Sequence, residues 1–156
     1  MQTVIVNVDG SAAGRAAVEW CATHLGPHDA VVAVGAVSAV GSFILDLPGF
    51  AGSTPAAIER AFRAHWCAPL TAAGLRWTAW FDHTTQAVAI GRAIEVKHPD
   101  LVVIGKPDHL ASDLVLGGPL RHALRACRCP LLIVPGERGG DPDAAASLQQ
   151  VEAGRR

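Results

Sequence analysis

The sequence has little charge and no long apolar run. No apolar run approaches the roughly 18 residues that a membrane-spanning helix needs. Only 17% of the 156 residues are charged, and the formal net charge is −1. No cluster of lysines and arginines precedes the terminal pair Arg155–Arg156. Since basic patches mark surfaces for nucleic acids and anionic membranes, we expect neither as a partner.

A secretory signal and paired metal-type cysteines are also missing. The first residues, 1–3, lead directly into an apolar segment without a basic region, which indicates a cytoplasmic protein. In that reducing compartment the four cysteines, Cys21, Cys67, Cys127 and Cys129, should be thiols. Cys127-x-Cys129 lacks the two-residue gap typical of redox or zinc pairs, so we interpret it as a helix-end thiol beside a loop thiol.

Signatures of catalysis are absent as well. The seven histidines show no metal-ligand spacing and none accompanies a nucleophile elbow. No pair of carboxylates is placed for acid–base catalysis. Gly10 and Gly14 do not form the G-x-G-x-x-G of a dinucleotide fold. We therefore expect no metal and no enzymatic activity beyond, at most, weak nucleotide hydrolysis.

The sequence does contain a regular alternation of apolar runs and helical patterns. Strands are expected at 3–8, 30–36, 75–81, 101–104 and 131–134, and helices at about 12–25, 55–73, 85–97 and 119–128. The order β-α-β-α-β-α-β-α-β requires a parallel sheet with helices on both faces. Alternation in 75–81 indicates a half-exposed edge strand. The unbroken runs 101–104 and 131–134 are typical of strands buried on both faces.

Residues 1–135 are expected to form one domain. Within it, residues 37–54 form a long connection with several apolar side chains. Such a connection is either a flap that packs over a pocket or partner, or a loop that covers its own domain. Beyond Pro135 the sequence is rich in Gly, Asp and Ala, so residues 136–156 are expected to be a flexible tail.

The topology also predicts where a ligand would bind. Ligands of parallel sheets lie beyond the carboxyl ends of strands, where the connections diverge. The two candidate positions are the exit of the first strand at Val8–Asp9–Gly10 and the exit of the fourth strand from Gly105 onward. After the fourth strand and its loop, a helix is expected to begin at Gly117–Gly118–Pro119, and the N-terminus of such a helix can bind phosphate. Asp9 is equally a common turn former before Gly-Ser, so both interpretations of this residue stay open.

Several segments together resemble the universal stress protein family, over about residues 3 to 135. They are Val8–Ser11, Ala17–Trp20, Pro99–Gly105, Leu116–Gly118 and Cys129–Pro135. The resemblance implies a three-layer α/β/α fold of the adenine-nucleotide alpha-hydrolase-like type, with a five-stranded parallel sheet of order 3-2-1-4-5. It also implies a homodimer, often formed along the fifth strand, here Leu131, Leu132, Ile133 and Val134.

The resemblance further implies a nucleotide site. In many members ATP binds between the exits of strands one and four. By this comparison Asp9 would lie against the base or ribose, and Ala36 near the edge of the adenine. The positions carried over to nucleotide binding are Val8, Asp9, Ala36, Gly105, Lys106, Gly117 and Gly118.

Two positions of the phosphate loop depart from the family pattern. Nucleotide-binding members have Gly, two residues, Gly, nine residues, then Gly and Ser or Thr. Gly105 and Gly118 match this pattern, whereas Asp108 and Pro119 replace the second glycine and the hydroxyl residue. A unit charge about 4 Å from a phosphate costs on the order of 4 kcal/mol at surface-like dielectric. Pro119 has no N–H to donate, and a lost donor to a charged group costs roughly 1.5–3 kcal/mol.

These departures lead to a functional prediction. We expect a regulatory protein of the stress response that resembles universal stress proteins but has a degenerate ATP-binding loop, with weak or absent ATP binding. The alternative is a sensor of an adenine nucleotide (ATP, AMP or cyclic AMP) that binds through a modified pocket.

Overall fold

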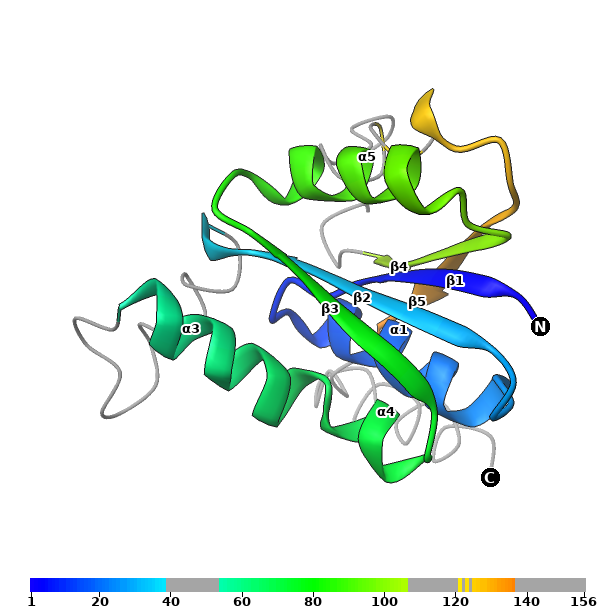
Figure 1. Cartoon of the computed structure of the whole chain (residues 1–156), viewed down its shortest axis with the longest axis horizontal. Helices are drawn as coiled ribbons and strands as arrows, with labels where there is room; N and C mark the ends of the chain where they lie inside the picture. Colours follow the sequence, from blue (N-terminus) through cyan, green and yellow to red (C-terminus); the bar gives the residue numbers. More distant parts are fainter. Residues whose placement is uncertain (39–53, 107–120, 122, 124, 137–156) are drawn as a thin grey trace, which may run out of the picture.

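The computed structural model describes residues 1–38, 54–106, 121, 123 and 125–136, which form a sheet between two layers of helices (Figure 1). Five strands pair in parallel in the order β3-β2-β1-β4-β5. The predicted three-layer fold and strand order are confirmed. The strands are β1 (Thr3–Asn7), β2 (Ala30–Ala36), β3 (Arg76–Asp82), β4 (Leu101–Lys106) and β5 (Leu131–Pro135).

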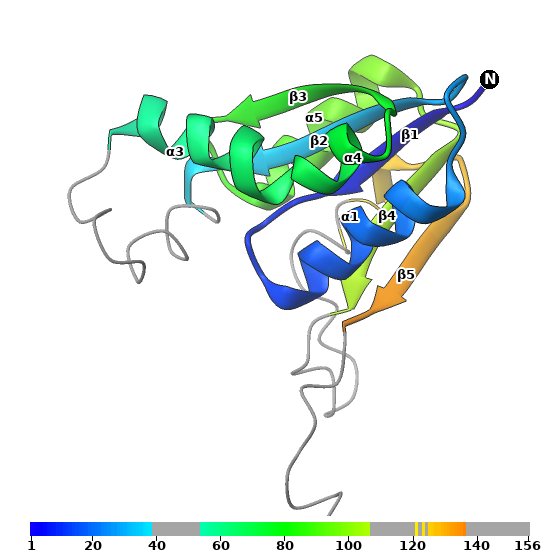
Figure 2. The same ribbon diagram turned by 90° about the horizontal axis from the view of Figure 1, so that it is seen from below.

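Helices cover both faces of the sheet. The described helical elements are α1 (Ala12–His24), α3 (Pro55–Ala61), the π-helical turn η1 (Phe62–Trp66), α4 (Ala68–Ala72) and α5 (Gln86–Lys97). In Figure 1, α5 lies on one face and α1, α3 and α4 lie on the other. Figure 2 shows α1 beside β4 and β5, with α3 and α4 farther toward β3.

The alternation of side chains along β1 separates two parts of the core. Val4, Val6 and Val8 point to the face of α1, α3 and α4 and belong to one cluster of buried residues. Ile5 points to the opposite face and packs in a second cluster with Ile90 and other residues of α5. Full burial of each such side chain stabilises the fold by roughly 1.5–3 kcal/mol. Asn7, the last residue of β1, brings a polar group into this apolar core.

The predicted single helix over 55–73 is wrong, because the structure divides it into three pieces. The Cys67 N–H donates to the Phe62 carbonyl, five residues back, at 3.1 Å, which is the spacing of a π-helix. Pro69 has no N–H for a carbonyl in the preceding turn, so the helix restarts with Pro69 in the first turn of α4. The bulge places the buried Phe62 ring on Gly35 of β2, where a Cβ would overlap the ring.

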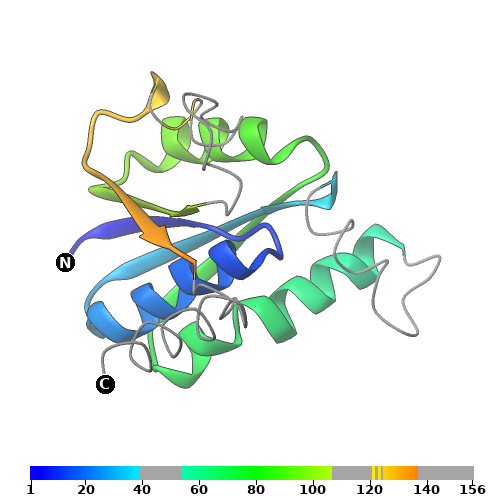
Figure 3. The ribbon, with the colours of Figure 1, turned by 180° about the vertical axis from the view of Figure 1, so that it is seen from behind.

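The two edges of the sheet differ from each other. The prediction of an edge strand at 75–81 is confirmed by β3. The prediction that 131–134 is buried on both faces is wrong, because β5 forms the other edge and Ile133 is 44% exposed. Figure 3 shows β5 in orange at this edge. An apolar run indicates that a segment forms a strand, but the position of that strand in the sheet decides how far its side chains are buried.

The cysteines differ from the prediction in part. Cys21 and Cys67 are buried free thiols, as expected. Cys127 and Cys129 are joined by a disulfide, so the prediction of thiols is wrong for this pair. The turn before β5 brings their Cα atoms to 5.4 Å, which lies within the range of disulfides.

Several predictions concern residues outside the described part of the chain. These are most of the connection 37–54, the tail beyond Gly136, and the loop positions Asp108, Gly117, Gly118 and Pro119. Among the described residues, none of the helices has the length and hydropathy to cross a membrane.

Candidate functional site

The carboxyl ends of the strands carry the predicted site. From β1 the chain passes through α1 to β2, whereas the other neighbour of β1 is β4, which is reached through α5. The connections therefore diverge between β1 and β4, the position at which open parallel sheets bind ligands. The structure describes five of the seven predicted residues. All five lie at or just beyond the carboxyl ends of β1, β2 and β4: Val8, Asp9, Ala36, Gly105 and Lys106.

Asp9 is held by its neighbours in the turn that follows β1. Its Oδ1 accepts hydrogen bonds from the Ser11 N–H at 3.0 Å and the Ser11 Oγ at 2.6 Å, and its Oδ2 accepts one from Asn7 Nδ2 at 3.3 Å. Gly10 has a φ of 87°, which favours glycine. The turn-forming interpretation of Asp9 is therefore what the structure shows, and nucleotide contact by Asp9 stays a prediction.

Ser11 connects this turn to α1. Its Oγ accepts the Gly14 N–H at 3.0 Å and so caps the helix. A Cβ on Gly14 would overlap the Asp9 carboxylate. The turn after β1 and the first turn of α1 thus form one hydrogen-bonded unit.

Gly105 has a packing role in this structure. A Cβ at this position would overlap the backbone carbonyl of Ala13, so the missing side chain lets the first turn of α1 lie directly on β4. The family resemblance predicts Gly105 as the first glycine of a phosphate loop. Its close contact with Ala13 would require a glycine here with or without a phosphate.

The other described positions differ in exposure. Val8 and Ala36 are fully buried, and the Val8 N–H donates to the Val34 carbonyl at 2.9 Å. Lys106 is exposed at the end of β4, opposite Pro135 of β5. Of these three, Lys106 is the side chain that an anionic ligand could meet from solvent.

The sequence analysis missed a buried pair of amide side chains at the carboxyl ends of the strands. Gln86, the first residue of α5, donates from Nε2 to Asn7 Oδ1 at 2.7 Å and to the Val34 carbonyl at 2.9 Å. Gln86 is 6% exposed and Asn7 is 2% exposed. The available signals were an asparagine within the apolar run of β1 and a glutamine at an inward-facing position of α5.

The Gln86 amide leaves one acceptor free. Two carbonyl-type oxygens face Nε2, so the orientation of the amide is defined by its partners. Oε1 is then buried without a hydrogen-bond partner among the described residues. An unpaired buried acceptor costs about 1–3 kcal/mol.

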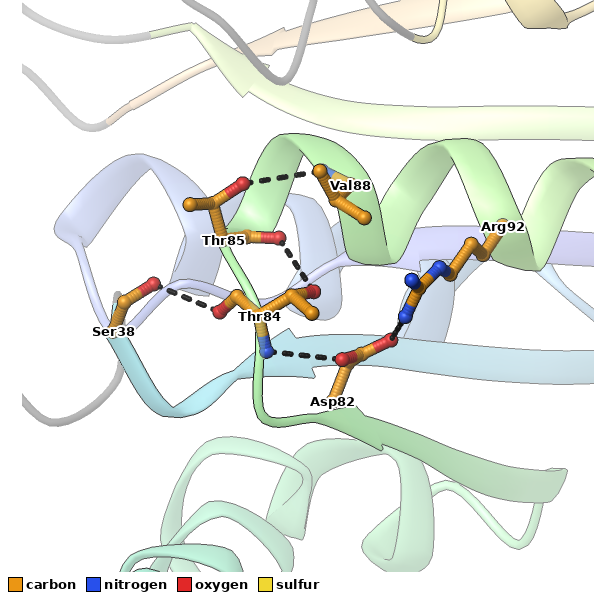
Figure 4. A network of polar contacts seen from close by, with 6 residues as sticks. All are labelled: Ser38, Asp82, Thr84, Thr85, Val88 and Arg92. Atoms are coloured by element: carbon orange, nitrogen blue, oxygen red, sulfur yellow. Dashed lines mark hydrogen bonds and ion pairs between the residues drawn. The ribbon is translucent and has the colours of Figure 1, made fainter.

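A second polar network holds the start of α5 in place (Figure 4). Asp82, at the end of β3, accepts the Thr84 N–H at 2.9 Å and pairs with Arg92 at 3.2 Å. Burial raises the pKa of Asp82, but the hydrogen bonds from Thr84 and the Arg92 guanidinium outweigh it and hold the pKa below its usual range. Ser38 Oγ donates to the Thr84 carbonyl at 3.1 Å.

Thr85 completes this network by capping α5. Its Oγ1 accepts the Val88 N–H at 3.4 Å. The cap fixes where α5 begins, and the next residue, Gln86, is thereby placed against the ends of β1 and β2. In the part of the chain that the structure describes, no group of three or more His, Cys, Asp or Glu side chains could hold a metal ion.

The similarity to known proteins extends over the whole domain that carries this site. The family model described as "Universal stress protein family" matches residues 1–135. The chain belongs to the universal stress protein family. The comparison with curated protein sequences finds no match.

Solved structures of the family share the fold. A universal stress protein in complex with cAMP is 21% identical, with a TM-score of 0.64, and covers 87% of this chain and 98% of its own. A family protein from Arabidopsis thaliana with AMP bound is 14% identical, with a TM-score of 0.59 and coverages of 92% and 99%. A universal stress protein from Archaeoglobus fulgidus is 15% identical, with a TM-score of 0.59 and coverages of 86% and 93%. At these identities the likeness concerns the fold.

Proposed function

We propose that this universal stress protein is a cytoplasmic regulator in the stress response that binds ATP weakly or not at all. The observation that carries the proposal is the sequence of the loop that follows β4. The strand β4 ends at Lys106, and Asp108 follows two residues later where ATP-binding members have glycine. Pro119 then removes one N–H at the expected start of the next helix.

The energetic cost of a carboxylate beside a phosphate is large enough to decide whether ATP binds. A carboxylate about 4 Å from a phosphate costs on the order of 4 kcal/mol, which corresponds to roughly a thousandfold loss of affinity. A triphosphate carries more negative charge than a monophosphate, so the same carboxylate disfavours ATP more than AMP. The proposal therefore concerns the triphosphate part of the ligand first.

A second candidate function is a sensor of AMP or cyclic AMP. The buried Gln86 Oε1 favours it, because this acceptor has no partner among the described residues and an adenine amino group is a donor. Two solved relatives of the same fold were determined with cAMP and with AMP. In this function, the adenine end of the ligand is recognised while the triphosphate is not.

Calorimetric titration of nucleotide-free protein with ATP, AMP and cyclic AMP tests both candidates. If the protein is a regulator with a degenerate loop, we expect no measurable ATP binding at micromolar concentration. Tight stoichiometric ATP binding would overturn that proposal. Strong binding of AMP or cyclic AMP without ATP would favour the sensor. Mass spectrometry of the supernatant from denatured protein would identify a nucleotide that copurifies.

A loop variant adds a positive control to this titration. The double change Asp108→Gly and Pro119→Ser restores the family pattern and should raise ATP affinity. Asp113→Gly is the matched control, because it removes the same charge from the same loop at a position that the pattern does not use. Equal effects of both changes would mean that only net charge matters.

We also propose that the protein acts as a homodimer formed along β5. Ile133 is 44% exposed on this edge strand, and an apolar edge with unpaired backbone groups invites pairing with another strand. A second copy would cover the apolar run that the single chain leaves partly exposed.

A further inference from the structure

A pair of cysteines lies at the opposite ends of the strands from the candidate nucleotide site, near the amino ends of β4 and β5. Cys127 and Cys129 are joined there by a disulfide just before β5. The Val102 N–H donates to the Pro130 carbonyl at 3.1 Å, which ties the turn to β4. The candidate nucleotide site lies at the carboxyl ends of the strands, so the cysteine pair is separate from it.

A hollow gives access to this disulfide. It has a volume of about 390 Å³ and is lined by residues from the turn and from the end of α5. Cys129 and Arg128 come from the turn, and Glu95 and His98 come from α5 and its C-terminal cap. Both cysteines are half-buried, and Cys129 lines the hollow, so the pair is in part open to small molecules from solvent.

A purely structural role explains this disulfide poorly. A disulfide stabilises a protein mainly by restraining the unfolded chain, and the effect grows with the length of the closed loop. The loop from Cys127 to Cys129 contains one intervening residue, so it restrains very little. The domain is also long enough to be stable through its core alone.

The turn accommodates the reduced form as well. Cys127 Sγ lies 3.4 Å from the Cys129 carbonyl oxygen, and the Cys129 N–H lies within 3.4 Å of the same sulfur. In the dithiol, the S–H of Cys127 can donate to that carbonyl, and the sulfur can accept from that N–H. The same backbone therefore supports both oxidation states.

We propose that Cys127 and Cys129 form a reversible redox site that exchanges with small thiols and their disulfides. On oxidation, a thiolate of the pair attacks a small disulfide RSSR, which breaks the S–S bond and releases one RSH after protonation. The second cysteine then attacks the mixed disulfide and releases the second RSH. Two electrons pass to RSSR, and the two protons of the cysteine thiols leave with the products.

The remaining cysteines provide an internal reference. Cys21 and Cys67 are buried, and burial raises the pKa of both thiols to about 12. Such thiols form little thiolate at neutral pH and react slowly. Exchange in the folded protein should therefore be confined to the pair before β5.

The test is equilibration of the folded full-length protein in glutathione buffers of varied ratio, followed by quenching, alkylation and mass spectrometry. We expect the pair to convert in one two-electron step between no alkylated cysteine and two, both mapped to the peptide with Cys127 and Cys129. Cys127→Ser and Cys129→Ser should each abolish this step and instead trap a single glutathione adduct. Cys21→Ala should leave it unchanged.

Each other result would overturn the proposal. A pair that stays oxidised in pure reduced glutathione would be a structural disulfide. A pair that stays reduced in excess glutathione disulfide, or gains two glutathiones, would not be a redox couple. This redox site does not depend on the proposed nucleotide function, so the two can fail separately.

Discussion

Gly105 of β4 lies directly against the backbone carbonyl of Ala13 in the first turn of α1. The helix can approach the strand this closely only because position 105 has no side chain. The contact joins the exits of β1 and β4, the two parts of the candidate nucleotide site, into one packed unit. A glycine suspected of binding phosphate therefore also has a clear structural task.

The first prediction concerns this contact. Gly105→Ala should lower the free energy of unfolding by about 1–3 kcal/mol, as overpacking does in other cores, because the new methyl group must displace α1. Urea unfolding at neutral pH measures the change. Gly26→Ala is the control, since a Cβ there meets only Asp29 Oδ2 at 3.8 Å. Equal stability of Gly105→Ala and the natural protein would contradict the contact.

The second prediction concerns the buried amides Gln86 and Asn7. Gln86→Leu should destabilise the protein by about 1–3 kcal/mol, because Asn7 Oδ1 and the Val34 carbonyl lose their donor. In the double change Gln86→Leu and Asn7→Val both partners become apolar. The double variant should therefore lose less stability than the sum of the two single variants. Strict additivity in this double-mutant cycle would show that the two amides do not interact.

The third prediction concerns acid stability. Hydrogen bonds from the Gly26 and Gln2 N–H groups, at 2.9 and 3.1 Å, hold the pKa of Asp29 below its usual range. Its contribution to stability is complete above the unfolded pKa, about 3.9, and is lost as the pH falls through the lower pKa of the folded state. Asp29→Asn should therefore flatten the fall in stability below about pH 4. Urea unfolding between pH 2 and pH 7 measures it, and an unchanged slope would count against the two hydrogen bonds.

The fourth prediction concerns the buried thiols. Burial raises the pKa of Cys21 and Cys67 to about 12, so iodoacetamide at pH 8 should leave both unmodified in the folded protein. After unfolding in urea, both should react within minutes. Mass spectrometry of the peptides measures the modification. Rapid labelling of either cysteine in the folded state would mean that its element opens to solvent.

The fifth prediction concerns the proposed dimer. Ile133→Asp should shift the protein toward monomer in light scattering coupled to size-exclusion chromatography, because it places a charge on the exposed edge β5. Thr78→Asp places the same charge on an exposed position of the opposite edge, β3, and should leave the oligomeric state unchanged. A dimer that survives Ile133→Asp but not Thr78→Asp would place the interface at β3.

The local sequence determined which segments become strands and helices. The apolar runs and the helical patterns predicted most of the described boundaries within one or two residues. These signals are local, since they depend on periodicity and on hydrogen bonds between near neighbours. The family resemblance then supplied the strand order, which the structure confirms.

The tertiary structure alone decided what each residue does at the site. The contact of Gly105 with Ala13 and the pairing of Gln86 with Asn7 each join segments far apart in the chain. The exposure of Ile133 likewise depends on the place of β5 in the sheet. A sequence pattern shows that a residue is apolar, small or polar, but not which distant group it will face. These relationships arise only when strands take their places in the sheet and helices pack on it, because packing at close range fixes distances that no local rule contains.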